Sequence, residues 1–222
     1  MSAGSGIEIT ENGPYAVSSA PLLRMGKERD EAGRPVAWER GEAVPTEPGY
    51  ELCRCGRSAD KPFCDGSHKV SPRFDGTETA DRAASASRRK EYMGEGLVLT
   101  DDKSLCEHAS FCVRGDIHAW KMVRQTSDAA GRAALESVVA SCPSGRLELH
   151  AVSDPTLIEP ELEPEIAVVV DGPLWIRGGI PVRSADGFTY EVRNRVTLCR
   201  CGASKNKPFC DGSHAEVGFC DG

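Results

Sequence analysis

The feature that most constrains this chain is a cysteine-rich segment that occurs twice. It reads CRCGRSADKPFCDGSH from Cys53 to His68 and CRCGASKNKPFCDGSH from Cys199 to His214. With the preceding leucine, residues 52–68 and 198–214 are identical at 14 of 17 positions. Each copy has a C-x-C pair, a third cysteine after eight further residues, and a histidine four positions later. Three thiolates and an imidazole can bind a metal together, so we expect two equivalent metal sites.

The chain has ten cysteines, at positions 53, 55, 64, 106, 112, 142, 199, 201, 210 and 220. They form three groups of three, with Cys220 left over as an expected free thiol. Disulfides have no reason to occur in threes, whereas metal sites do when the fourth ligand is another residue. We also expect Asp65 to be the N-cap of a helical turn that carries His68.

Length and composition favour small modules over one large core. The 222 residues include 23 glycines and 14 prolines, and only 6% are aromatic, which suits units closed by loops or by bound metal. The net charge of −7 and the lack of a long basic run argue against nucleic-acid binding. No apolar run reaches the roughly 18–20 residues of a membrane helix, and no secretory signal is recognised. We therefore expect a cytoplasmic protein that does not bind membranes.

The repeat extends upstream of the cysteines. IEITENGPYAV (residues 7–17) parallels IAVVVDGPLWI (residues 166–176), and each predicts a strand, a turn and a second strand. The first copy is 13 residues longer, and the polar stretch at residues 24–35 is expected to form the extra loop. We expect one domain at 1–80 and its counterpart at 166–222.

A different unit is expected between the two repeats, at residues 92–152. Residues 94–102 predict a strand and a turn, and residues 133–140 have apolar positions at helical spacing, followed by a final strand. Residues 81–91 are small and polar and predict a linker or a short helix. Residues 153–165 carry three prolines among acidic residues and predict an extended linker.

Two metals fit the repeated ligand set: structural zinc or a [2Fe–2S] cluster with one histidine ligand. Zinc fingers usually take their ligands from two knuckles, which this spacing lacks. The pattern C-x-C-x2-S-x3-P-x-C-D-G-S-H resembles that of CDGSH iron–sulfur proteins, the mitoNEET-like family. The matching residues are Cys53, Cys55, Ser58, Pro62, Cys64, Asp65, Gly66, Ser67 and His68, and Cys199, Cys201, Ser204, Pro208, Cys210, Asp211, Gly212, Ser213 and His214.

The resemblance implies a redox-active [2Fe–2S] cluster in each repeat. The implied ligands are Cys53, Cys55, Cys64 and His68, and Cys199, Cys201, Cys210 and His214. It also implies two units packed through a β-rich cap, here as a pseudo-twofold pair within one chain. A neutral histidine in place of a fourth thiolate raises the reduction potential and makes the cluster sensitive to pH.

The middle unit carries a second cysteine pattern. Cys106 and Cys112 are separated by five residues, and Cys142-Pro143 follows. The segment resembles the divergent monocluster ferredoxin domain that accompanies CDGSH sequences in bacteria, with Ala109 where a further cysteine would stand. Three thiolates favour a [3Fe–4S] cluster. A [4Fe–4S] cluster remains open if His108, water or another small ligand binds the fourth iron, and so do three buried free cysteines.

The expected fold class is α+β, with two β-rich CDGSH units and an inserted ferredoxin-like domain. We expect a non-enzymatic iron–sulfur protein, because no nucleophile–base pair, phosphate loop or cofactor fingerprint occurs. Its expected role is one-electron transfer or redox sensing with a flavoprotein reductase or a ferredoxin. The alternative is cluster storage and transfer to an apo-protein; a structural zinc protein ranks below both. The chain is expected as a monomer with an intramolecular CDGSH pair or as a homodimer.

Overall fold

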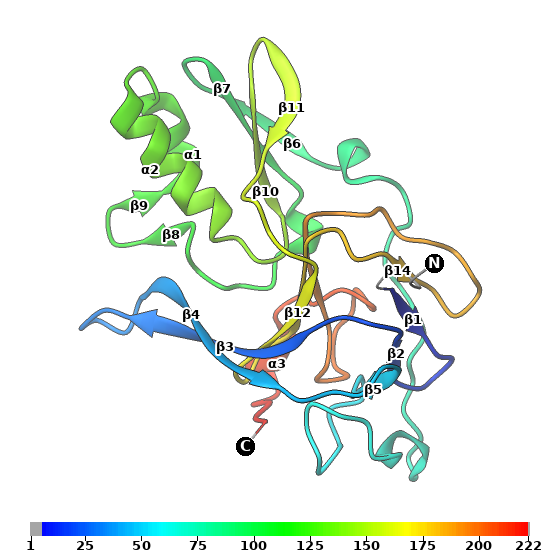
Figure 1. Cartoon of the computed structure of the whole chain (residues 1–222). Coiled ribbons are helices and arrows are strands. Elements are labelled where there is room, and N and C mark those ends of the chain that lie inside the picture. The colour runs from blue at the N-terminus through cyan, green and yellow to red at the C-terminus, as the bar shows by residue number, and fades with distance from the viewer. Residues whose placement is uncertain (1–5, 222) are drawn as a thin grey trace.

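The computed structural model describes residues 6–221 (Figure 1). The first repeat contains β1 (Ile7–Ile9), β2 (Tyr15–Val17), β3 (Leu22–Arg29), β4 (Pro35–Val44), β5 (Tyr50–Leu52) and the 3-10 turn η1 (Ser67–Lys69). The second repeat contains β12 (Glu165–Val169), β13 (Leu174–Arg177), β14 (Val182–Arg183), β15 (Arg195–Leu198) and α3 (Ser213–Glu216). The expected strand–turn–strand units are therefore present in both repeats.

The turns between the paired strands have the same backbone form. Asn12 and Asp171 lie in the left-handed region, with φ of 48° and 50°. Asparagine and aspartate tolerate this conformation better than other non-glycine residues, which explains why they precede Gly-Pro in both copies.

Strands of the two repeats share two sheets. One has the order β14-β1-β2-β5, in which Ile7 pairs with Val182 in parallel. The other, which we call the central sheet, has the order β15-β13-β12-β3-β4, and Ile166 pairs there with Leu22 in parallel. Each sheet therefore takes strands from both ends of the chain.

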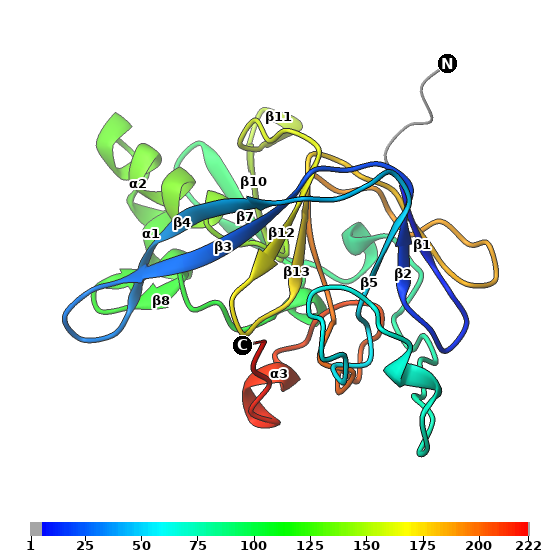
Figure 2. The same cartoon turned by 60° about the horizontal axis from the view of Figure 1, so that its bottom comes forward.

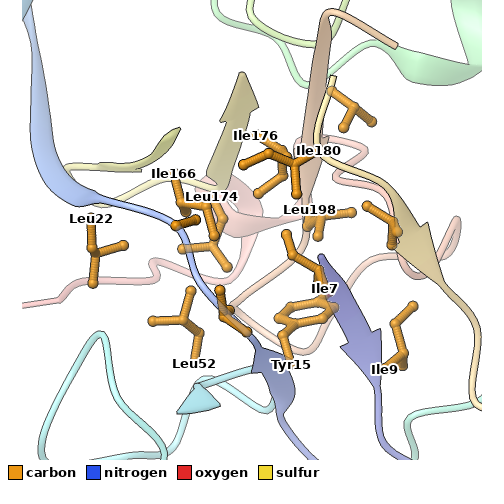
Figure 3. Packing of buried hydrophobic residues seen from close by; sticks show 14 of the residues in the cluster. Ile7, Ile9, Tyr15, Leu22, Leu52, Ile166, Leu174, Ile176, Ile180 and Leu198 are labelled. Carbon is orange, nitrogen blue, oxygen red and sulfur yellow. The ribbon is translucent and has the colours of Figure 1, made fainter. Parts of the chain in front are cut away.

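The principal core lies between these two sheets (Figure 3). Ile7, Tyr15 and Leu52 of the first repeat meet Ile166, Leu174 and Leu198 of the second, and each is at most 1% exposed. Burying one large apolar side chain contributes about 1.5–3 kcal/mol. The repeats are thus held together by a common core.

The polar insertion is a hairpin, in contrast to the loop expected at residues 24–35. β3 and β4 pair from Leu22–Val44 to Arg29–Pro35, and Asp30 closes the turn by accepting from the backbone N–H groups of Ala32 and Arg34 at 3.0 and 2.9 Å. Residues 26–29 of β3 are glycine or charged, and residues 39–43 of β4 are all exposed, so neither strand shows the regular apolar alternation that would predict it.

The middle module has its own sheet and core. Its elements are the 3-10 turn η2 (Ser85–Ser87), which precedes it, then β6 (Lys90–Met93), β7 (Leu97–Asp101), η3 (Lys103–Leu105), β8 (Val113–Arg114), β9 (Ile117–His118), α1 (Ala119–Met122), η4 (Val123–Gln125), α2 (Ala129–Ala140), β10 (Leu147–Ala151) and β11 (Asp154–Ile158). Asp128 caps α2 by accepting from the Gly131 N–H at 2.7 Å. Leu135, Val138 and Val139 of α2 pack into the module core.

The segment expected as a linker at 153–165 begins with a strand. Residues 154–158 form β11, which pairs with β10 and extends the module sheet to the order β11-β10-β7-β6. Pro155 and Pro160 made the segment look like a linker. Proline is tolerated in a strand only at the edge of a sheet, and β11 is such an edge strand. Only the residues after β11 connect the module to β12.

The module packs against the shared part of the fold (Figure 2). Trp38 of β4 lies between Phe111 of the module and Trp175 of β13, with ring centroids 4.9 Å apart in both pairs. Its indole nitrogen also donates to the Ser141 carbonyl at 2.9 Å. The hairpin that lengthens the first repeat therefore contacts the module. Within residues 6–221, no helix has the length and apolar character needed to cross a membrane.

Candidate metal centres

The first CDGSH site follows directly from β5. Cys53 and Cys55 leave the strand end with their sulfur atoms 3.8 Å apart, and the Cys64 sulfur lies 3.4 Å from Nδ1 of His68. The Cys53 N–H donates to the Pro62 carbonyl at 2.8 Å, which returns the loop to the strand. Cys53 and Cys55 are buried, whereas Cys64 and His68 are partly exposed.

The second site repeats this arrangement after β15. The Cys199 and Cys201 sulfurs are 3.6 Å apart, and the Cys210 sulfur lies 3.3 Å from Nδ1 of His214. The Cys199 N–H donates to the Pro208 carbonyl at 2.8 Å. Cys210, at 2% exposed, is more deeply buried than its counterpart Cys64.

Each histidine lies on a short turn that begins at a left-handed glycine. Gly66 and Gly212 have φ of 86° and 90° and are the N-cap residues, in place of the expected Asp65. Asp65 still accepts from the Ser67 N–H at 2.9 Å, so it supports the turn from one position earlier. Hydrogen bonds from backbone N–H groups, first that of Ala59, lower the pKa of Asp65 to about 2.

The two C-x-C loops touch each other. Cys55 and Cys201 form an antiparallel bridge. A Cβ on Gly56 would lie 2.4 Å from the Cys201 carbonyl oxygen, and a Cβ on Gly202 would lie 2.6 Å from that of Cys55. Only glycine permits this approach. Folding therefore brings the two cysteine-rich repeats side by side.

An arginine between the first two cysteines of each site was not predicted to have a role. Arg54 donates to the carbonyls of Gly13 and Gly76, and Arg200 donates to those of Gly172 and Val169. Both are 2% exposed. Both fasten their C-x-C loop to the turn between the paired strands, and Arg54 also holds the segment after its CDGSH loop at Gly76. The repeated triplet Cys-Arg-Cys was the signal available in the sequence.

The short distance between the two thiols of each C-x-C pair changes their pKa values. The hydrogen bond with Cys55 lowers the pKa of Cys53 to about 6, and the one with Cys201 lowers the pKa of Cys199 to about 6. The same contacts raise the pKa of Cys55 and Cys201. A second thiolate beside the first is thus unfavourable without a cation, so metal binding must release protons.

The middle cysteines also converge. Cys106, Cys112 and Cys142 line one cavity of about 200 Å³, together with Trp120 and Arg146. Burial raises the pKa of Cys112 to about 11. The Ser144 hydroxyl lies 3.7 Å from the Cys142 sulfur, and Ala109 lines the same cavity. The cavity therefore presents three thiols to a common interior.

His108 lies against the second CDGSH site. It is exposed, and its Cδ2 would be 2.4 Å from a Cβ placed on Gly212.

Glu107 was not singled out from the sequence. It is 2% exposed, and one ligand atom each of Glu107, Cys210 and His214 lies within 4.8 Å of the others. Burial raises the pKa of Glu107 to about 7, opposed by the nearby Lys27 ammonium. One glutamate beside a cysteine forms no pattern, so no sequence signal indicated this position.

The donor sets fit iron–sulfur centres. Each repeat supplies three thiols and an imidazole, and the module supplies three thiols. Among residues 6–221, the buried Nη1 atoms of Arg54 and Arg200 have no hydrogen-bond partner, which leaves donors beside both C-x-C loops. Hydrogen bonds to cluster sulfur are a known means of tuning such centres.

Comparison with protein-family models gives two matches. Residues 12–69 and 171–215 match the iron-binding zinc finger of CDGSH type, and residues 92–151 match the divergent 4Fe-4S mono-cluster family. No curated protein and no solved structure matches the chain. The fold and the donor sets thus define an iron–sulfur-binding protein. The chain is a CDGSH iron–sulfur domain protein in which two CDGSH motifs flank a divergent monocluster ferredoxin domain.

Proposed function

We propose that this chain is a non-enzymatic electron carrier or redox sensor with three iron–sulfur centres. Cys53, Cys55, Cys64 and His68 would hold one [2Fe–2S] cluster, and Cys199, Cys201, Cys210 and His214 the other. Cys106, Cys112 and Cys142 would hold a [3Fe–4S] cluster, or a [4Fe–4S] cluster with an added ligand. Such clusters accept and release single electrons.

The observation that carries this proposal is the continuity of the three donor sets. The two C-x-C loops meet at the Cys55–Cys201 bridge, and Glu107, next to Cys106, has a ligand atom within 4.8 Å of those of Cys210 and His214. The shared sheets and core favour a pseudo-twofold pair formed within one chain. The second CDGSH site adjoins the first through the C-x-C loops and the middle module through Glu107, an order that suits passage of an electron from one centre to the next.

A second candidate is cluster storage and transfer to an apo-protein. It is favoured by the open side of the first site: no described atom lies within 4 Å of a Cβ placed on Gly66, and Cys64 and His68 are partly exposed. A cluster held there could be reached by an acceptor thiol. The two candidates differ in whether iron leaves the protein.

Electron paramagnetic resonance before and after reduction tests the proposed centres. Reduced [2Fe–2S] and oxidised [3Fe–4S] clusters give separable signals. We expect about seven iron atoms per chain with [3Fe–4S] and about eight with [4Fe–4S], because each [2Fe–2S] cluster supplies two. Four iron atoms would show an empty middle module, and a colourless protein after anaerobic purification would refute the proposal.

The role is tested with two partners. Fast reduction by a flavoprotein reductase, with all visible absorbance retained, supports the electron carrier. Movement of that absorbance to apo-ferredoxin supports the cluster donor.

A further inference from the structure

Glu107 is a buried acid whose polar atoms are unsatisfied. It is 2% exposed, and neither carboxylate oxygen has a hydrogen-bond partner of standard geometry among residues 6–221. Leaving such a group unpaired typically costs about 1–3 kcal/mol, and more when it is charged. The Lys27 ammonium and the Ala109 N–H act on this carboxyl, and the acceptor positions that remain on its two oxygens are open to a further donor in the working protein.

The nearest ligand-capable groups belong to the second CDGSH site. Glu107, Cys210 and His214 have ligand atoms within 4.8 Å of one another, and the Cys210 sulfur lies 3.3 Å from Nδ1 of His214. Nδ1 therefore lies beside the Cys210 sulfur, and Nε2 is the ring nitrogen left to make a different contact.

The loop that carries Glu107 is fixed to this site at several points. The Asn206 side chain donates to the Ser104 carbonyl at 2.9 Å, and the His108 ring packs on Gly212. Further along the module, buried Arg195 of β15 donates to the Cys142 carbonyl at 2.7 Å. Contacts at both ends of the module's cysteine pattern thus hold Glu107 against the second site.

We propose that Glu107 is a positioning residue that accepts a hydrogen bond from the ring nitrogen of His214 that does not bind iron. Histidine ligands almost always donate their second N–H to a carboxylate, a carbonyl or water, which fixes the ring and strengthens the metal bond. The inference rests on the Cys3His ligand set of the proposed function. It means that a residue adjacent to a ligand of the middle centre also secures the histidine of the second CDGSH centre.

The first CDGSH centre lacks this support within residues 6–221. No group of three metal-binding side chains was found around His68, and no described atom lies within 4 Å of a Cβ placed on Gly66. The charge of Glu51 acts on Cys64, but Glu51 is exposed. Removal of the Glu107 carboxylate should therefore affect one [2Fe–2S] cluster and spare the other.

The test compares cluster loss from the loaded full-length protein and two variants. Glu107→Met keeps a similar length but removes the acceptor, and Glu107→Gln keeps an acceptor oxygen. With a chelator at neutral pH, we expect Glu107→Met to speed the loss of one of the two [2Fe–2S] clusters about tenfold, the lower range for loss of a supporting contact. Glu107→Gln should stay close to wild type, and Glu51→Met, the same substitution beside the first site, is the control that should leave the second cluster unchanged.

The affected cluster is identified in a His68→Cys background, where only the second site keeps a histidine ligand. Pulsed paramagnetic resonance should then show an altered histidine nitrogen coupling in Glu107→Met and its restoration in Glu107→Gln. Equal acceleration of both clusters, acceleration of the first alone, or no change would overturn the proposal. If Glu107→Met does not load clusters, Glu107→Asp supplies the test, with a smaller effect confined to the same cluster.

A wild-type protein without histidine-ligated [2Fe–2S] signals would instead refute the proposed ligand set. That result appears before any variant is compared, so the two failures are distinguishable.

Discussion

The two CDGSH loops have nearly the same sequence and the same sulfur spacing, but they face different neighbours. Cys64 and His68 border open space at Gly66, whereas Cys210 and His214 lie under the module loop that carries Glu107 and His108. The ligand set is determined within each loop, and its surroundings are determined by the rest of the fold. Two identical motifs can therefore have different stability and access.

The largest expected difference comes from removing one ligand at each site. Cys64→Ser should remove about two iron atoms, those of the first [2Fe–2S] cluster, and leave the middle centre intact. Cys210→Ser should remove the second cluster and also reduce occupancy of the middle centre, because the 104–108 loop rests on that site. Iron and sulfide analysis with paramagnetic resonance measures both. Equal effects on the middle centre would contradict the asymmetry.

Alanine substitutions at Gly66 and Gly212, both in the left-handed region, test the contact between His108 and the second site. Gly66→Ala and Gly212→Ala should each cost about 1–2 kcal/mol from backbone strain. Gly212→Ala should cost roughly 1–3 kcal/mol more, because its Cβ would meet His108 at 2.4 Å. Denaturant unfolding of the loaded proteins gives the difference, and Gly66→Ala serves as the control. Equal destabilisation would show that His108 moves aside freely.

A smaller effect is expected from copying the first loop into the second. Asn206→Asp gives the second loop the residue that the first loop has at the equivalent position, Asp60. The change removes the side-chain donor to the Ser104 carbonyl. We expect a loss of about 0.5–1.5 kcal/mol, near the lower end because the bond is exposed. The reverse change, Asp60→Asn, should be neutral. Thermal unfolding of both variants measures the change in stability. A loss of stability in Asp60→Asn but not in Asn206→Asp would contradict the expected difference between the two loops.

The smallest effect concerns pH in the cluster-free protein. Burial, aided by the Lys27 and Arg200 charges, lowers the pKa of His214 below its usual 6.5. The folded state therefore favours neutral His214, and its contribution to stability is full above pH 6.5 and is lost as the pH falls toward the lowered pKa. His214→Gln should reduce the fall in melting temperature between pH 7 and pH 5 by about 1–2 °C. A larger reduction in His68→Gln would contradict the difference in burial.

The ligands could be predicted from the sequence, because C-x-C and the later cysteine and histidine lie within one short loop whose spacing is visible in the chain. The contact of the two sites was expected only from the family resemblance. Glu107 could not be found, because it meets His214 only after folding. The β3–β4 hairpin was missed because residues 26–29 are glycine or charged and residues 39–43 are all exposed, so the two strands lack the alternation of a half-buried strand.

The exchange of strands between the repeats has a consequence for how the protein is made. β1 completes its sheet with β14, and β3 pairs with β12, so the first repeat lacks neighbours until the last third of the chain leaves the ribosome. At about 5–20 residues per second, this delay is on the order of ten seconds after β5 is synthesised. During that time the thiols of Cys53 and Cys55 have no finished site around them. We therefore expect stable maturation of the first centre to follow synthesis of the second repeat, and a nascent chain stalled in the middle module should contain no stable CDGSH cluster.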